Sequence, residues 1–473
     1  MLSIKRRGAA RLAAAVVASG LVAAGAIATA GPAAADGTTP SHGGATATLG
    51  GLKTFDQAVV HNDGGDQRVG AGLFEMAVDN GGTLQTYCID IHNPTQQQAK
   101  YQEVPWSASS LHNNGDAGKI RWILQNSYPQ VNDLAALAAK AGAGNLTEKT
   151  AAAGTQVAIW RFSDHAKVDA VDPAAEKLAD YLEKSAQNVA EPKASLTLDP
   201  PAVSGKSGSK LGPVTVHTNA DSVTISPAAG VPAGAKVVGK DGKPVTSATD
   251  GTQLFFDVPA GAADGSSSLT AQAATKVPVG RAFTGIGEHA KSQTQILAGS
   301  SESTVSAAAT FSWKKQGAIP AITAEKNCAK GGVDVTASNK GDEAFRFQLS
   351  GKDYEIAPGK SQTVTVPVAE DQPYDITIKG EGGFKKSFSG VLDCKTAGSG
   401  GGKPSSQPSP ASVGGSTGGD TGGDTGGDKG GDLAETGSSN ATPVIAGIAV
   451  VLVVVGGAAV FFLRKKKAGT PAQ

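Results

Sequence analysis

The chain is poor in cysteine, methionine and aromatic residues. It has three cysteines and two methionines in 473 residues, and 5% of its side chains are aromatic. Its seven histidines show no metal-ligand spacing, so we expect no metal and no other cofactor. It also lacks a basic patch with interleaved aromatic residues, which argues against a nucleic-acid partner. The length and the 63 glycines predict a loop-rich protein of two or three domains.

The charge balance changes once the two ends are set aside. The chain has 42 basic and 42 acidic residues, but residues 36–436 carry 34 basic against 42 acidic ones, a net charge of about −8. Four basic residues lie near the start, before an uncharged run rich in Ala, Val and Leu that closes on GPAAADG. This order is typical of a secretory signal peptide, here residues 1–35, and we expect cleavage after Ala35 and a secreted mature chain.

The other end predicts a membrane anchor behind a linker. Residues 442–463 carry no charge and match the ~20 apolar residues that span a bilayer. Residues 464–473 form a basic tail, which favours the cytoplasmic side. Residues 396–432 are rich in Gly, Ser, Pro and Asp, cannot bury a core, and predict a flexible linker.

Between linker and anchor lies LAETG, and this order of pentapeptide, apolar segment and basic tail resembles the cell-wall sorting signal of Gram-positive bacteria. The family pattern is L-P-x-T-G, and alanine in place of proline resembles the form of high-GC actinobacteria. The resemblance implies a sortase, of class E or another housekeeping type, that cuts between Thr436 and Gly437 and joins Thr436 to a peptidoglycan cross-bridge amine. A plain single-pass membrane protein is the alternative. The motif residues are Leu433, Ala434, Glu435, Thr436 and Gly437.

Residues 194–315 and 316–395 predict two all-β sandwich domains. Stretches with period-two alternation, such as QLFFDVP, TQILAG, GVDVTAS and YDITIKG, lie between Gly, Asn, Asp and Pro turns. Cys328 and Cys394 flank the second of these domains, and we expect them to form a disulfide. Closing a loop of about 67 residues is worth about 4 kcal/mol on the chain-entropy model.

Residues 36–193 predict an α+β domain. Strand-like stretches come first (GATATLGGL, AGLFEMAVDN and LQTYCIDI), and four helical runs follow. Ile120, Ile123 and Leu124 recur at helical spacing. Asp172 followed by Pro173 is a suitable N-cap and first-turn pair for the last helix.

Cys88 in this domain has no partner if the other two cysteines pair. An unpaired cysteine in a secreted protein is oxidised, paired between chains, buried, or used in chemistry. The second clue is GTQVAIW in the third helical run, where Gln156 and Trp160 share a helix face. Gly154 removes a side chain where another backbone could approach.

YCID, followed some 65 residues later by TQxA[IV]W, resembles the thioester domain of Gram-positive surface adhesins. In that family a cysteine sulfur is bonded to a glutamine side-chain carbonyl. The resemblance implies that Cys88 and Gln156 form this bond. It further implies an α+β thioester domain that attaches covalently to an amine, that of a lysine, on a partner surface. The supporting motif residues are Tyr87, Asp90, Thr155, Ala158 and Trp160.

The residue types suit this chemistry, because a thiolate is the strongest common nucleophile and a carboxamide that loses ammonia leaves an acyl group. We expect apolar walls from Tyr87, Ile89 and Trp160. The predicted function is a wall-anchored adhesin that reacts once, not an enzyme. Two alternatives stay open: a structural wall protein with an inert buried cysteine, and a cysteine peptidase or transglutaminase-like enzyme. His92 and His165 are the histidines close to the two motifs.

Overall fold

The computed structural model describes residues 43–394. The predicted signal peptide, linker, sorting motif, apolar segment and basic tail lie outside the described residues. Within residues 43–394, no helix is both long enough and apolar enough to cross a membrane.

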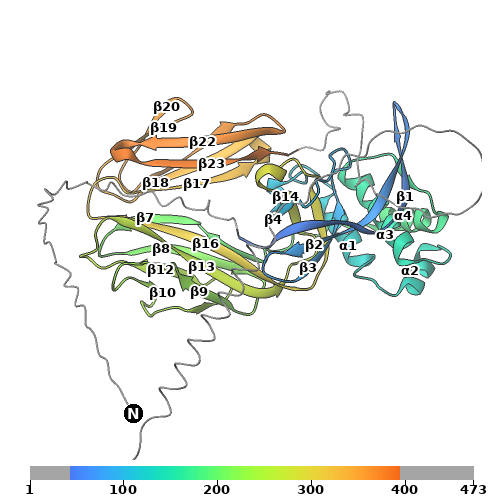
Figure 1. The fold of residues 1–473 in the computed structure, drawn as a ribbon, viewed down its shortest axis with the longest axis horizontal. Helices are drawn as coiled ribbons and strands as arrows, with labels where there is room; N and C mark the ends of the chain where they lie inside the picture. The colour runs from blue at the N-terminus through green and yellow to red at the C-terminus, as the bar shows by residue number, and fades with distance from the viewer. Residues whose placement is uncertain (1–42, 395–473) are drawn as a thin grey trace, which may run out of the picture. The chain divides into compact units, whose positions relative to one another are not determined.

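The first sheet has seven strands in the order β2-β3-β15-β14-β4-β1-β5. Strand β1 also pairs with β2, so the pairings from β2 round to β1 close on themselves. Figure 1 shows β14, in yellow, beside β4, in blue. The strands are β1 (Thr46–Asn62), β2 (Gly65–Val78), β3 (Thr83–Cys88), β4 (Lys100–Val104), β5 (Val168–Ala170), β14 (Ala282–Gly285) and β15 (Gln295–Ser300).

The hairpin of β14 and β15 corrects one prediction. TQILAG was expected to be a strand of the sandwich at 194–315, and it is a strand, but it pairs with β3 in the first sheet. Alternation predicts that a stretch is a strand and does not say which strand it pairs with. All but the last residue of β15 are buried, whereas strands of the sandwich alternate buried and more exposed positions.

Four helices accompany this sheet, as the sequence predicted. Ile120, Ile123 and Leu124 are fully buried on the first of them. The Asp172 side chain caps the last one by accepting from two backbone N–H groups at its start. A Cβ at Gly154 would lie 2.4 Å from the Ala175 carbonyl oxygen, which confirms that another backbone approaches there. The helices are α1 (Ala117–Asn126), α2 (Leu134–Ala141), α3 (Glu148–Ser163) and α4 (Pro173–Ser185), with a short 3-10 helix η1 (Trp106–Ala108).

The second domain is a sandwich of a four-stranded sheet, β10-β12-β8-β6, and a five-stranded sheet, β11-β9-β13-β16-β7. Its core holds Phe256 stacked on Phe311, with ring centroids 4.9 Å apart. Its strands are β6 (Leu196–Asp199), β7 (Ala202–Lys206), β8 (Lys210–Thr218), β9 (Val223–Pro227), β10 (Lys236–Val238), β11 (Ser247–Ala248), β12 (Gln253–Asp257), β13 (Gly265–Lys276) and β16 (Glu302–Lys314).

The third domain is a smaller sandwich of sheets β17-β18-β21 and β20-β19-β22-β23. Cys328 and Cys394 form the expected disulfide, with Cα atoms 5.4 Å apart. Its strands are β17 (Pro320–Asn327), β18 (Gly332–Asn339), β19 (Phe345–Leu349), β20 (Lys352–Ile356), β21 (Ser361–Pro367), β22 (Gln372–Gly380) and β23 (Lys385–Leu392).

Candidate functional site

Cys88 and Gln156 lie together in the core of the first domain. Cys88 is the last residue of β3, and Gln156 projects from the middle of α3. The backbone N–H of Cys88 donates to Gln156 Oε1 at 2.9 Å, and Gln156 Nε2 donates to the Cys88 carbonyl oxygen at 2.8 Å. Both residues are fully buried. The carboxamide is therefore held against the cysteine in one fixed orientation.

The Cys88 thiol is free and shielded from water. Its sulfur accepts a hydrogen bond from the Asp90 backbone N–H at 3.3 Å. Burial, together with the nearby Asp164 and Asp90 carboxyl groups, raises the pKa of this thiol well above its ordinary value. The sulfur is thus protonated before any reaction, and an attack on a carbonyl requires a base to remove that proton.

Two carboxyl groups beside the cysteine have raised pKa values. Burial raises the pKa of Asp164 to about 6. Asp164 Oδ1 accepts from the Ile91 backbone N–H at 2.9 Å, which fixes it next to the turn after Cys88. Burial also raises the pKa of Asp90 well above its ordinary value, and Asp90 Oδ2 accepts from Asn93 Nδ2 at 2.7 Å. With a pKa of about 6, Asp164 can accept a proton near neutral pH.

The other predicted motif residues surround the pair as packing groups. Tyr87 is fully buried and donates its hydroxyl hydrogen to the Tyr128 carbonyl oxygen at 2.7 Å. Thr155 donates to the Ala151 carbonyl oxygen of its own helix, and Ala158 is fully buried. Ile89 and Trp160 are buried as well, so the apolar walls expected around the cysteine are present.

Unpaired polar atoms gather at this site. Six buried side-chain N or O atoms of the described residues have no hydrogen-bond partner, and three of them are Asp90 Oδ1, Trp160 Nε1 and Thr294 Oγ1. A buried polar atom without a partner costs free energy, and functional sites are where such costs are retained.

Neither histidine named from the sequence contacts the pair. His92 is half-buried, and burial lowers its pKa. His165 is exposed, on backbone with a φ of 50°. Within residues 43–394, neither ring is hydrogen-bonded to Cys88 or Gln156.

No local sequence pattern pointed to the segment next to Cys88 on the side of β15. Gln295 lies directly opposite Cys88 in the antiparallel pairing. The Ile89 backbone N–H donates to the Thr294 carbonyl oxygen at 3.1 Å, and Gln293 Nε2 donates to the Asp90 carbonyl oxygen at 2.9 Å. About 200 residues separate the two segments, so no local spacing links them.

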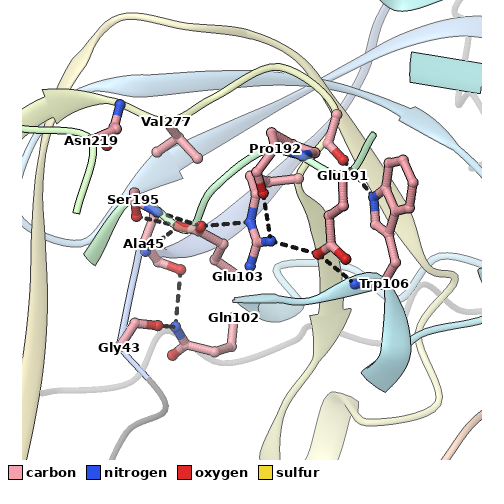
Figure 2. Close-up of polar contacts among 12 residues, drawn as sticks. Gly43, Ala45, Gln102, Glu103, Trp106, Glu191, Pro192, Ser195, Asn219 and Val277 are labelled. Atoms are coloured by element: carbon pink, nitrogen blue, oxygen red, sulfur yellow. Dashed lines mark hydrogen bonds and ion pairs between the residues drawn. The ribbon is translucent and has the colours of Figure 1, made fainter. Parts of the chain in front are cut away.

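A buried ion pair fixes the start of the same hairpin (Figure 2). Arg281 Nε donates to Glu103 Oε1 at 2.9 Å, and Arg281 Nη1 donates to Glu191 Oε1 at 2.7 Å. Glu103 also accepts from the backbone N–H groups of Ser195 at 2.9 Å and Ala45 at 3.1 Å. The cluster joins β4, the residue before β14, and the segment that leads from α4 into the sandwich.

A second group of carboxyls adjoins this site, because repulsion from Asp393 adds to burial in raising the pKa of Asp90. Glu370, Asp371 and Asp393 each bring an oxygen within 4.8 Å of the others. Burial, and then repulsion from Asp371, raises the pKa of Asp393 to about 7. Carboxylates alone do not make a metal site, so the absence of a metal stays a prediction.

Residues 85–188 match the family model of the thioester domain, and residues 320–391 match that of the bacterial phospholipase C C-terminal domain. The first match contains both Cys88 and Gln156, and it supports a thioester-domain protein. No curated protein matches the chain in sequence.

The solved structures to which this chain is similar include two TIE proteins. The Bacillus anthracis TIE protein is 13% identical, with 74% of this chain and 81% of that chain covered and a TM-score of 0.27. The thioester domain of the Enterococcus faecium TIE86 protein is 17% identical, with 59% and 99% covered and a TM-score of 0.25.

Proposed function

We propose that this chain is a surface adhesin that forms an internal thioester between Cys88 and Gln156 and then attaches covalently to an amine. One observation supports the proposal above the others: the Gln156 carboxamide is held by two hydrogen bonds on the backbone of a buried free cysteine.

The first step joins the Cys88 sulfur to the Gln156 side-chain carbon. The S–H bond and the C–N bond of the carboxamide break, the S–C bond forms, and the thiol proton leaves with the amide nitrogen as ammonia. An ionised Asp164 carboxylate next to the turn after Cys88 can accept the thiol proton and return it to the leaving nitrogen.

The backbone N–H of Cys88 assists this step. It donates to Gln156 Oε1, which is the oxygen that gains negative charge when sulfur attacks the carbonyl. Its 2.9 Å length lies within the range of oxyanion donors, where loss of one donor typically costs about 10²–10³ in rate.

In the second step a primary amine attacks the thioester carbonyl. The C–S bond breaks, an amide bond forms to the amine, and the Cys88 sulfur regains a proton. The buried position of both residues protects the thioester from water until the amine enters. The carboxamide nitrogen is lost in the first step, so the site reacts once and does not turn over. Lysine side chains on a partner surface supply the amine in this proposal.

A covalent grip suits a protein held on a cell surface, since non-covalent affinity is limited and every such complex has an off-rate. We further propose that the chain is secreted and anchored to a Gram-positive cell wall through residues 433–437. The support is in the sequence: a signal peptide at one end, and the pentapeptide, apolar segment and basic tail in order at the other.

The intact mass of a secreted fragment, 36–395, tests the thioester. We expect it to be lighter by about 17 Da, the mass of one ammonia, beyond the two hydrogens of the disulfide. Cys88→Ala and Gln156→Ala should each retain the ammonia. Incubation with methylamine should add one methylamine at Gln156 of the wild-type fragment and none to either variant. A full mass in freshly purified protein would refute the thioester and leave the inert cysteine or a cysteine enzyme as the reading.

A further inference from the structure

A chain of buried hydrogen bonds runs past Cys88 between residues two positions before it and two positions after it. Thr86 Oγ1 donates to Gln295 Oε1 at 3.0 Å, Gln295 Nε2 donates to Gln293 Oε1 at 3.1 Å, and Gln293 Nε2 donates to the Asp90 carbonyl oxygen at 2.9 Å. All four residues are at most 1% exposed. We call Gln293 and Gln295 the glutamine brace.

The brace continues where the strand pairing stops. β3 ends at Cys88, and the chain bends at Ile89, so the ladder that fixes residues 83–88 does not extend to Asp90. Gln295 lies opposite Cys88, and directly opposite residues share a face of a sheet, so the Gln295 side chain is on the face of the thiol. From there Gln293 reaches the Asp90 carbonyl beyond the bend.

The hairpin holds Gln293 firmly. The Tyr101 hydroxyl donates to the Gln293 carbonyl oxygen at 2.8 Å, and its oxygen lies 2.8 Å from Ser292 Oγ. Burying two uncharged amides costs free energy unless they are hydrogen-bonded, and an apolar pair would fill the same space without that requirement. The side-chain amide of each brace glutamine accepts one hydrogen bond and donates one, which fixes the orientation of the amide.

We propose that Gln293 and Gln295 are positioning residues for the thioester. They hold Asp90 so that its N–H meets the Cys88 sulfur and the sulfur faces the Gln156 carbonyl. The inference rests on the proposed function. It assigns part of the thioester site to a hairpin that lies beyond residues 85–188, the segment matched by the thioester-domain model.

The test compares Gln293→Met and Gln295→Met with Gln130→Met in the full chain. Gln130 is the matched control, because its Nε2 also donates to a backbone carbonyl of the hairpin, that of Ala298 at 2.8 Å, but it is not part of the brace. Three quantities are measured: the fraction with the 17 Da loss in freshly purified protein, the rate of reaction with methylamine, and the melting temperature.

Each brace variant leaves a buried amide or carbonyl group without a hydrogen-bond partner. We therefore expect both variants to form the thioester about tenfold more slowly than the wild type, so that much of each preparation retains its ammonia. The control should carry the full loss and react at the wild-type rate. Thr86→Val keeps the side-chain shape and removes the first donor, and it should also lower the fraction with the 17 Da loss. It serves as the test if the methionine variants do not fold.

The outcomes separate the two proposals. A wild-type chain without the 17 Da loss overturns the proposed function itself. The brace proposal is overturned if the wild-type chain shows the loss and the folded brace variants, or Thr86→Val, also show the full loss and react with methylamine at the wild-type rate. Brace variants with a lowered melting temperature but the full 17 Da loss also overturn the brace proposal, because they show that the two glutamines have a structural role alone.

Discussion

Cutting the chain at residue 193, before the hairpin of β14 and β15 that is inserted into the first sheet, should abolish both folding and thioester formation. The sequence alone places the end of the first domain at residue 193, and a fragment of residues 36–193 contains Cys88, Gln156 and the whole segment 85–188. It lacks β14 and β15, which separate β3 from β4 in the first sheet.

The loss can be sized from three side chains of the hairpin. Phe283, Ile296 and Leu297 are fully buried. Burying a large apolar side chain is worth about 1.5–3 kcal/mol, so the three together contribute about 5–9 kcal/mol. A domain has about 5–15 kcal/mol in all, and the fragment also loses the Arg281 partner of buried Glu103. We therefore expect the fragment to be largely unfolded.

The assay is thermal or urea unfolding of 36–193 beside 36–315, with the intact mass of each. The longer fragment should unfold cooperatively and show the 17 Da loss, and the shorter one should show neither. A short fragment with a cooperative transition and the full ammonia loss would refute the view that the hairpin completes the first domain.

Three further substitutions test single contacts. Because burial raises the folded-state pKa of Asp164 to about 6, the folded chain keeps a proton that the unfolded chain releases, and stability should fall as pH rises from about 4 to 6. Asp164→Asn should remove up to about 3 kcal/mol of that pH dependence, measured by urea unfolding at several pH values; an unchanged slope would contradict the shift. Gly154→Ala should cost about 1–3 kcal/mol, because its Cβ would meet the Ala175 carbonyl at 2.4 Å, and a neutral result in thermal unfolding would show that the helices can separate. Glu103→Ala should cost about 3–5 kcal/mol by removing one of the two carboxylates that pair with buried Arg281, and the double variant with Arg281→Met should recover part of this in the same assay.

Local patterns predicted the helices, and the resemblance to the thioester domain singled out Cys88 and Gln156, which are hydrogen-bonded to each other. Ile120, Ile123 and Leu124 are buried as their spacing indicates, and Asp172 caps α4. Cys88 was singled out by elimination, since the other two cysteines could pair across one small domain, and that disulfide is formed. These features depend on residues close in sequence or on a count.

The partners of β3 could not be predicted in the same way. Gln293 lies two residues before β15 and Gln295 is the first residue of that strand. Polar residues are mostly exposed, so nothing local indicates that the two are buried beside Cys88. Strand alternation carries no information on pairing across about 200 residues. Asp164 also went unnoticed, because its role depends on burial at the end of α3 and not on a motif.

The inserted hairpin also changes how tension would pass through the molecule. The backbone crosses between the first sheet and the sandwich three times: near Ser195, between β13 and β14, and between β15 and β16. A single tether would let one domain swing on the other. With three crossings, a pull that arrives along β16 is divided, and one share runs along β15 in shear against β3, where several backbone hydrogen bonds must break together before the strand that ends in Cys88 can move.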